Sequence, residues 1–366
     1  MLNGITPDLR FGWEWKTGSA DIREMEVEIR RSDGTFPATL LIPSGFSPPL
    51  PGWVTLHGIT RLGRKHPTLV RYVRALAASG AAVLVPEIPE WCEMLMAPRE
   101  AADTLRSAIL ALADREETAS DRLGAMGFSF GGPPALMAGM DPDLLPHLKV
   151  VASFGGYCDL ERTLHFLFSG KHDWKGESFD LEPDPYGRWV VGGNYLSAAE
   201  GYEGEDEVAE ALLSLARAAG DLQLPSWETH HEVRKGELEA ALPPSRRGLF
   251  RAFAPPHGVE VPSDRIGALV PALARAARRD SPLFDIAPHL PGLKVPVRLI
   301  HGRQDRLMPF TETLRLAENF PPGADVRAFL TGLFSHSQRD TKKTKIRELG
   351  EQLWFLRIMS GVLGML

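Results

Sequence analysis

The feature that most constrains the fold is a series of short apolar runs separated by amphipathic segments. Four of these runs are each long enough for one buried strand: 52–58, 81–89, 122–129 and 149–157. In the segment 99–117 between two of them, Leu105, Ile109 and Leu112 recur at helical spacing, with charged residues on the other face. Strands that alternate with helices indicate parallel βαβ units. The chain is therefore expected to form an open, mostly parallel α/β sheet with helices on both faces.

Two further apolar runs lie far downstream, at 295–302 and 324–332, beyond a middle region without a clean strand pattern. That middle region, residues 158–290, carries helical patterns such as those at 206–220 and 263–280. A structureless loop of such length inside a compact domain would be exceptional. The sequence therefore predicts a mainly helical cap, residues 158–290, inserted between the sixth and seventh strands of one core sheet.

The core itself is expected to be discontinuous and to combine residues 1–157 with residues 291–366, because strands on both sides of the insertion must complete one sheet. Apolar and charged residues alternate at 24–31, and a second strand-like run follows a turn signal at 35–43. These two runs add strands at the start of the core.

Composition narrows the class of protein. The 366 residues carry a formal net charge of -6 with a pI near 6.0, which gives no electrostatic reason to expect nucleic acid as a partner. Two cysteines, Cys92 and Cys158, cannot build a disulfide framework. Residues 1–16 lack a secretory pattern, and the apolar tract 353–366 is interrupted by Arg357 and too short to span a bilayer. We expect a cytoplasmic protein that does not insert into a membrane.

One serine stands among glycines where a predicted strand gives way to a helix. The segment 127–131, Gly-Phe-Ser-Phe-Gly, fits the G-x-S-x-G pattern of a nucleophile elbow, with Ser129 at its centre. Pro133 and Pro134 fall in the first turn of the expected helix, where a missing N–H costs nothing. The pattern alone is short, and an ordinary glycine-rich turn is the alternative. A serine becomes a nucleophile only with a base and a group that orients that base.

Later segments supply both groups in the expected order. The run at 295–302 is followed by a turn that carries Asp305, and the run at 324–332 is followed by a polar loop that carries His336. The order Ser, Asp, His is that of a triad built on strand ends of an open α/β sheet, where such sheets bind ligands. Ser129, Asp305 and His336 are therefore the candidate catalytic residues.

With these motifs the chain resembles the α/β-hydrolase superfamily, as a serine esterase-like member with a large helical cap. In that family, H-G-x-x-D-x-x-V/P-P after the penultimate strand carries the acid, and residues 301–309 (HGRQDRLMP) match it with Met308 in place of the usual valine. The resemblance covers about residues 23–157 and 291–366 and leaves the insertion unassigned. It implies an α/β-hydrolase fold and no metal or organic cofactor.

The same resemblance suggests an oxyanion hole. His57-Gly58-Ile59 is similar to the family's H-G-x segment after the third strand. The backbone N–H groups of Ile59 and of Phe130, the residue after the nucleophile, are the candidate donors for negative charge on the attacked carbonyl. His57 is interpreted as a support for this loop and not as a catalyst.

Alternatives remain for several of these residues. Asp305 is also suited to cap a helix that begins near Phe310, and His336 to be a surface histidine. Asp159, after the strand that follows the elbow, is a rival acid. The pair His230–His231 suggests a metal, but adjacent histidines point apart and further ligands at metal-site spacing are lacking, so a solvated cap segment is the interpretation.

Two positions are weaker candidates for substrate binding. Arg61 begins the basic run 61–66, whose field would attract a carboxylate- or phosphate-bearing substrate, although a solvated loop that flanks a helix is the favoured interpretation. Trp91 lies in a loop expected at the active-site end of the sheet. The cap contributes aromatic rings that either line an apolar pocket or build the cap's own core: Phe166, Phe168, Trp174, Trp189, Tyr195, Trp227, Phe250 and Phe253.

The sequence thus predicts a serine hydrolase that cleaves a hydrophobic small-molecule ester through an acyl-enzyme intermediate. The same triad also serves amide, thioester or C–C bond hydrolysis and acyl transfer, which residue spacing does not distinguish. A non-catalytic ligand-binding protein on this fold is the alternative from a different class.

Overall fold

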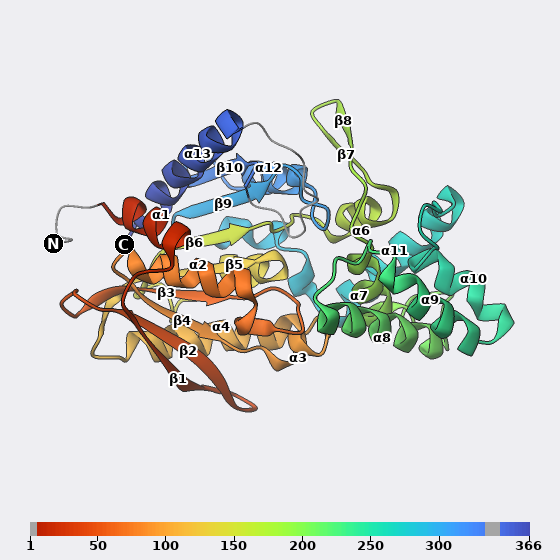
Figure 1. The fold of residues 1–366 in the computed structure, drawn as a ribbon, viewed down its shortest axis with the longest axis horizontal. Coiled ribbons are helices and arrows are strands. Elements are labelled where there is room, and N and C mark those ends of the chain that lie inside the picture. Colours follow the sequence, from red (N-terminus) through yellow and green to blue (C-terminus); the bar gives the residue numbers. More distant parts are fainter. Residues whose placement is uncertain (1–5, 334–344) are drawn as a thin grey trace.

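The computed structural model describes residues 6–333 and 345–366 (Figure 1). Its centre is an eight-stranded sheet of order β1-β2-β4-β3-β5-β6-β9-β10. The strands are β1 (Ile22–Arg31), β2 (Gly34–Pro43), β3 (Leu50–Leu56), β4 (Ala82–Pro86), β5 (Thr118–Phe128), β6 (Leu148–Phe154), β9 (Val297–Gly302) and β10 (Val326–Thr331). β1 and β2 pair antiparallel with each other and β2 pairs antiparallel with β4, while the other pairings are parallel. The predicted mostly parallel sheet is confirmed.

Helices cover both faces of this sheet. One face packs against α1 (Pro7–Thr17), α2 (Pro67–Ala78) and α13 (Lys345–Leu363). The other face packs against α4 (Pro98–Ala113), α5 (Gly132–Ala138) and α12 (Phe310–Glu318). Within β4, Val83 and Val85 belong to the first layer and Leu84 to the second, as the twofold alternation of a strand requires. Burial on both sides explains why these strands are continuously apolar in sequence.

Between β6 and β9 the chain builds a separate group of helices, shown mainly in green in Figure 1. They are α6 (Leu160–Ser169), α7 (Pro185–Tyr195), α8 (Asp206–Leu222), α9 (His230–Ala241), α10 (Pro244–Phe253) and α11 (Ser263–Asp280), followed by the 3-10 turns η3 (Pro282–Phe284) and η4 (Ala287–Gly292). Most of the cap aromatics, among them Trp189, Phe250 and Phe253, are buried in a hydrophobic cluster of these helices. These rings therefore build the insertion's own core.

The insertion also contains a hairpin that the sequence analysis did not predict. β7 (Lys171–Trp174) and β8 (Glu177–Asp180) pair antiparallel around Lys175 and Gly176, both in the left-handed region. The hairpin projects from the helices, and its strand β7 contacts α12 of the core (Figure 1). Both strands are short and none of their residues is fully buried, which explains why they are largely polar. A pattern of buried residues was therefore missing from the sequence.

The hairpin and the first helix of the insertion, α6, hold α12 from two sides. The ring of His172 in β7 packs edge-on against the ring of Phe310, with 5.2 Å between the ring centroids, and His172 Nδ1 lies 3.1 Å from Thr311 Oγ1. On the other side, the buried carboxylate of Glu312 accepts hydrogen bonds from Asp159 N at 2.8 Å and Arg162 Nε at 2.8 Å. These contacts fix α12 between the core and the insertion.

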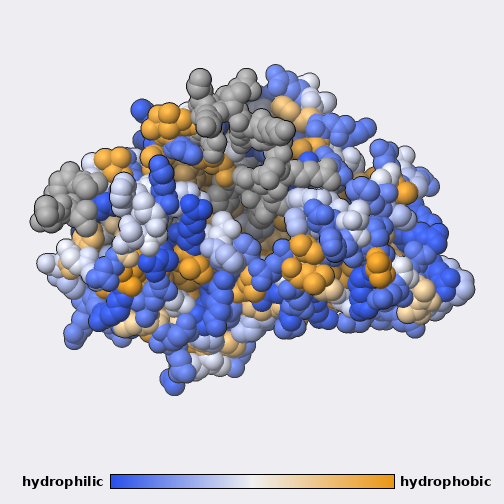
Figure 2. Space-filling model, viewed as in Figure 1, coloured by the Kyte–Doolittle hydropathy of each residue, from blue (hydrophilic) through white to orange (hydrophobic). Residues whose placement is uncertain are grey.

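The surface in Figure 2 is mostly hydrophilic, with apolar groups scattered over both the core and the insertion. Across the described ranges, 6–333 and 345–366, the search for a helix with the length and apolar character needed to cross a bilayer finds none.

Candidate active site

Ser129 occupies a strained turn at the carboxyl end of β5. Its φ is +56°, in the left-handed region that non-glycine residues rarely adopt, and its side chain is almost completely buried. The 3-10 turn η2 (Ser129–Gly131) follows at once and leads into α5. Pro133 and Pro134 lie in the first turn of α5, as predicted. The strand, sharp turn and helix of a nucleophile elbow are therefore present.

The glycines of the motif are required by close backbone approach. A Cβ on Gly127 would collide with the carbonyl oxygen of Gly131. A Cβ on Gly131 would lie 3.2 Å from the carbonyl oxygen of His57, so that any side chain there would crowd the neighbouring loop. The turn can therefore close this tightly only with glycine at Gly127.

The loop after β3 lies directly beside the serine. A Cβ on Gly58 would be 3.4 Å from Ser129 Cβ, which places this backbone in contact with the elbow. Within the described residues, neither Ile59 N nor Phe130 N has a hydrogen-bond acceptor. Both predicted oxyanion donors thus belong to segments that meet at the elbow.

His57 holds this loop through both ring nitrogens. The Ile88 N–H donates to Nε2 at 3.1 Å, so the ring proton lies on Nδ1, which donates to the Gly58 carbonyl oxygen at 2.7 Å. Burial lowers the pKa of His57 and favours this neutral form. Because a trans peptide points its C=O and N–H in opposite directions, fixing the Gly58 carbonyl also fixes the direction of the Ile59 N–H.

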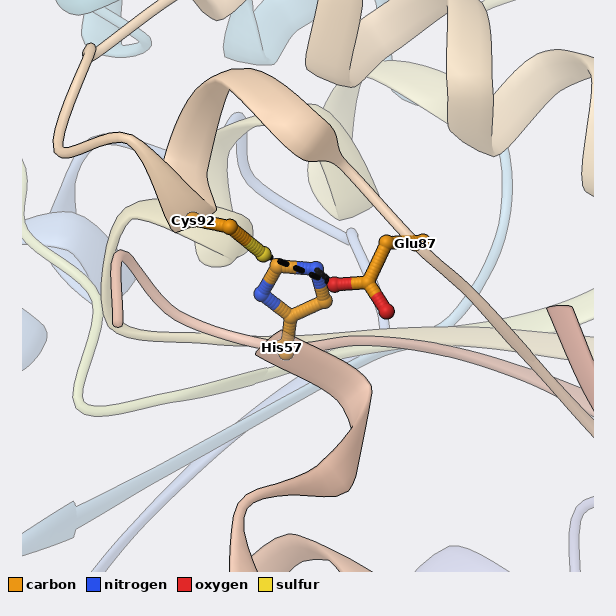
Figure 3. Close-up of side chains that lie close together, drawn as sticks. All are labelled: His57, Glu87 and Cys92. Atoms are coloured by element: carbon orange, nitrogen blue, oxygen red, sulfur yellow. Dashed lines mark hydrogen bonds and ion pairs between the residues drawn. The ribbon is translucent and has the colours of Figure 1, made fainter. Parts of the chain in front are cut away.

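The side chains of His57, Glu87 and Cys92 lie together beneath this loop and form the one group of potential metal ligands found among the described residues (Figure 3). Cys92 Sγ donates to Glu87 Oε1 at 2.8 Å, and His57 Nε2 lies 3.8 Å from the same oxygen. A metal at Nε2 would have to displace the Ile88 N–H, and it would approach Arg64, whose Nε is 2.9 Å from Glu87 Oε2. The residues therefore fit a hydrogen-bonded network better than a metal site.

Asp305 occupies the turn between β9 and α12 and is buried. Its Oδ1 accepts hydrogen bonds from Leu307 N at 2.9 Å and Met308 N at 3.0 Å. The residue preceding α12 is Pro309, so Asp305 organises its own loop and does not cap the helix. His301 lies alongside, with Nε2 3.7 Å from Asp305 Oδ2 and 2.9 Å from the Met308 carbonyl oxygen.

The remaining predicted positions have different outcomes. His336 lies outside the described residues, so its role stays a prediction. Asp159, the rival acid, is the N-cap of α6, and its side chain accepts a hydrogen bond from Arg162 N at 2.8 Å.

The histidine pair on α9 was predicted to be solvated, which is wrong for one member. His230 is exposed, but His231 is buried against the Trp189 ring. The cause is the packing of α9 on the insertion core, which its sequence alone does not reveal.

Arg61 and Trp91 line the boundary between core and insertion. Arg61 Nε is 2.8 Å from Asp221 Oδ1 of α8, and its Nη1 is 2.7 Å from Glu93 Oε1, so its charge is already paired. Trp91 of α3 (Pro89–Cys92) is buried and donates from Nε1 to the Met96 carbonyl oxygen at 2.7 Å. Substrate binding by either residue stays a prediction.

Trp91 also lines a small apolar pocket between the elbow helix and the insertion. It shares the pocket with Met96, Pro98, Phe130, Pro133, Pro134, Met137, Tyr157, Leu283 and Phe284. The pocket leaves only about 10 Å³ for water, which is room for roughly one molecule. The side chains of the core and insertion fill this space themselves.

The first turn of α7 covers the elbow region, and the sequence analysis did not identify it. Tyr186 Oη lies 3.4 Å from the Ile59 carbonyl oxygen, while a Cβ on Gly187 would be 3.2 Å from Leu307 Cδ2. The turn thus bridges the loop after β3 and the loop of Asp305. The sequence Asp184-Pro185, an N-cap followed by proline at the first helical position, was the available signal.

This sheet, with a sharp strand–turn–helix at Ser129, has an α/β-hydrolase fold, and comparison with solved structures supports that assignment. The chain is similar to esterase Est22 (TM-score 0.52, 13% identity, 98% of this chain and 84% of that one). It is also similar to a Rhizomucor miehei esterase (0.51, 14%, 99% and 91%) and to brefeldin A esterase, described as a bacterial homologue of human hormone sensitive lipase (0.50, 18%, 95% and 78%). No protein-family model and no curated protein matches the chain.

Proposed function

We propose that the chain is a serine hydrolase that cleaves carboxylic ester bonds of small molecules through an acyl-enzyme intermediate. The observation that carries the proposal is the backbone of Ser129, held at φ +56° between a strand and a helix. Such strain persists only where the surrounding structure enforces it, and it concentrates at functional sites. The esterase names of similar solved structures agree with this proposal.

In the proposed reaction, His336 removes the proton from Ser129 Oγ as this oxygen attacks the ester carbonyl. Asp305 holds the imidazole in the required tautomer and stabilises the imidazolium that forms. Support for this role comes from its burial and from the two backbone N–H groups that orient its Oδ1. The alcohol leaves with the proton from the imidazolium, and a water activated by the same histidine then releases the acid.

The N–H groups of Ile59 and Phe130 are proposed to stabilise the tetrahedral oxyanion, each donor lowering the barrier by about 3 kcal/mol. Their unused hydrogen-bonding capacity among the described residues supports this role. The His57 contact with the Gly58 carbonyl supports it further, since a donor that is already oriented needs no reorganisation during the reaction.

The test is the variant Ser129→Ala, assayed with 4-nitrophenyl esters of increasing acyl length. We expect turnover to fall by about 10⁴-fold or more, with unchanged circular dichroism. The matched control is Ser153→Ala, because Ser153 is also buried and its Oγ has no partner among the described residues. That control should retain full activity.

A fluorophosphonate probe separates the enzyme from a ligand-binding protein on the same fold. The proposal requires covalent labelling of Ser129 in the folded wild-type chain and none in Ser129→Ala. Folded wild-type protein that neither labels nor hydrolyses any ester would instead support the binding protein.

A further inference from the structure

An arginine in the helical insertion combines deep burial with a guanidinium that has no hydrogen-bond or ion-pair partner among the described residues. Arg188 belongs to α7, and only 8% of its surface is exposed. Its Nε is fully buried without an acceptor, and none of its nitrogens forms a hydrogen bond or ion pair with a described residue. Its guanidinium carbon lies 5.8 Å from the centroid of the Phe168 ring.

The nearby acidic residue is already engaged elsewhere. Asp184, the N-cap of α7, accepts through Oδ1 from Tyr186 N at 3.0 Å and from Ser226 Oγ. It attracts Arg188 electrostatically, yet the two side chains form no ion pair within 4.0 Å. Burial dominates and lowers the pKa of Arg188 to about 10, which is the sign of a charge that the fold does not compensate.

Two arginines on the core side of the boundary with the insertion differ from Arg188, because both form ion pairs. Arg61 is paired with Asp221 and Glu93, and Arg64 with Glu26 and Glu87. The basic run 61–66 was the sequence candidate for attracting an anion, but these two charges are neutralised within the protein. Arg188 is about as buried as Arg64, but its guanidinium has no such partner among the described residues.

Arg188 also belongs to the helix whose first turn contacts the loops of the proposed reaction centre. It follows Tyr186 and Gly187, which contact the loops of Ile59 and Asp305. Its neighbour Asp184 donates from its backbone N–H to the Arg306 carbonyl oxygen at 2.8 Å, directly beside Asp305. Arg188 follows Asp184 by four residues, which is about one helical turn.

We propose that Arg188 binds a carboxylate group of the substrate, so that the preferred substrates are esters that carry a second, anionic carboxyl group. The inference rests on the proposed function. A planar guanidinium matches a carboxylate with two parallel N–H···O bonds. An isolated buried charge is destabilising, and an incoming carboxylate supplies the missing partner.

The charge count favours a carboxylate over a phosphate. Arg188 contributes one positive charge, and Asp184 nearby contributes negative charge. A carboxylate adds a single negative charge, whereas a phosphate monoester carries close to two at neutral pH. The surroundings offer at most one positive charge, so a phosphate would leave more negative charge uncompensated than a carboxylate.

The kinetic experiment compares esters matched in size and different in charge. One pair is 4-nitrophenyl hydrogen glutarate with 4-nitrophenyl valerate, and the other is the butyrate ester of 4-hydroxybenzoate with that of its methyl ester. In at least one pair, wild-type kcat/KM should favour the anionic ester. Arg188→Met should lower kcat/KM for that ester by about 10- to 100-fold and change the neutral one by less than about twofold. Arg188→Lys should restore part of the loss.

The control variant is Arg234→Met in α9, since Arg234 is also a cap arginine but is half exposed and paired with Glu237 at 3.1 Å. This variant should leave kcat/KM unchanged for both esters of each pair. An equal loss on neutral and anionic esters in Arg188→Met would show a structural role only and overturn the proposal.

A binding measurement keeps this inference separate from the proposed function. In the Ser129→Ala background, glutarate should raise Tm, and the additional change Arg188→Met should remove that rise. If no ester is hydrolysed but this Arg188-dependent shift is present, the proposed function fails while the carboxylate site stands. A shift with inorganic phosphate but not glutarate, or no shift with either, would overturn the carboxylate assignment.

Discussion

The core loops around Ser129 and the insertion helix α7 bury polar groups in different ways. In the core, Asp305 and His57 lie at strand ends, where backbone N–H and C=O groups of neighbouring turns satisfy them. In the insertion, Arg188 and Trp189 lie on one helix with buried nitrogens that have no acceptor among the described residues. The polar groups of these two core loops are thus satisfied by the fold itself, whereas α7 of the insertion keeps buried donors that something else could complete.

The largest expected effect tests whether Asp305 is the catalytic acid. Asp305→Asn should lower kcat by about 10⁴-fold, because an amide favours the wrong imidazole tautomer. Its Oδ1 can still accept from Leu307 N and Met308 N, so stability should change little. Ester kinetics and urea unfolding measure the two effects.

The matched variant is Asp159→Asn, which retains a helix cap on α6. It should keep activity within a few fold of the wild type. A larger loss in Asp159→Asn than in Asp305→Asn would transfer the acid role to the rival position.

A second prediction compares a core glycine with an insertion glycine. Gly127→Ala should destabilise the protein by about 3 kcal/mol or more, since the added Cβ collides with the Gly131 carbonyl oxygen. Gly267→Ala in α11, where a Cβ meets nothing within 4 Å, should stabilise it by about 0.5–1 kcal/mol. Chemical denaturation of both variants is the measurement, and effects of the same sign would contradict the contrast.

The smallest effect concerns the contact between the two regions. Burial lowers the pKa of His172 below its ordinary value of 6.5; Arg315 and His301 act in the same direction, against Asp173 and Asp180. Below pH 6.5 the unfolded chain therefore binds more protons than the folded one, and stability decreases as the pH falls.

Unfolding free energies at pH 7.5 and 5.5 should reveal this dependence, and His172→Phe should reduce it. His230→Gln, a change at an exposed histidine of α9, serves as the control and should leave the dependence as it is. An unaltered pH dependence in His172→Phe would show that the hairpin contact with α12 is not sensitive to this ring.

Much of the core could be predicted because its signals are local. Continuous apolar runs identified the buried strands, and G-x-S-x-G followed by two prolines identified the turn at Ser129. The hairpin β7–β8 could not be predicted, because its strands are short, polar and held by α12, which is distant in sequence. The burial of His231 was missed for the same reason, since it depends on which face of α9 meets Trp189.

By itself, the sequence determined the alternation of strands and helices in the core, the residue types of the proposed triad and the presence of a mainly helical segment between two core strands, because periodicity and turn chemistry act over a few neighbouring residues. Only the tertiary structure decided which charges are neutralised. Arg61 and Arg188 are equally basic in sequence, but the first meets two carboxylates from α8 and from the loop after α3, while the second meets an aromatic ring. That difference arises because electrostatic partners are chosen by distance in space and not along the chain.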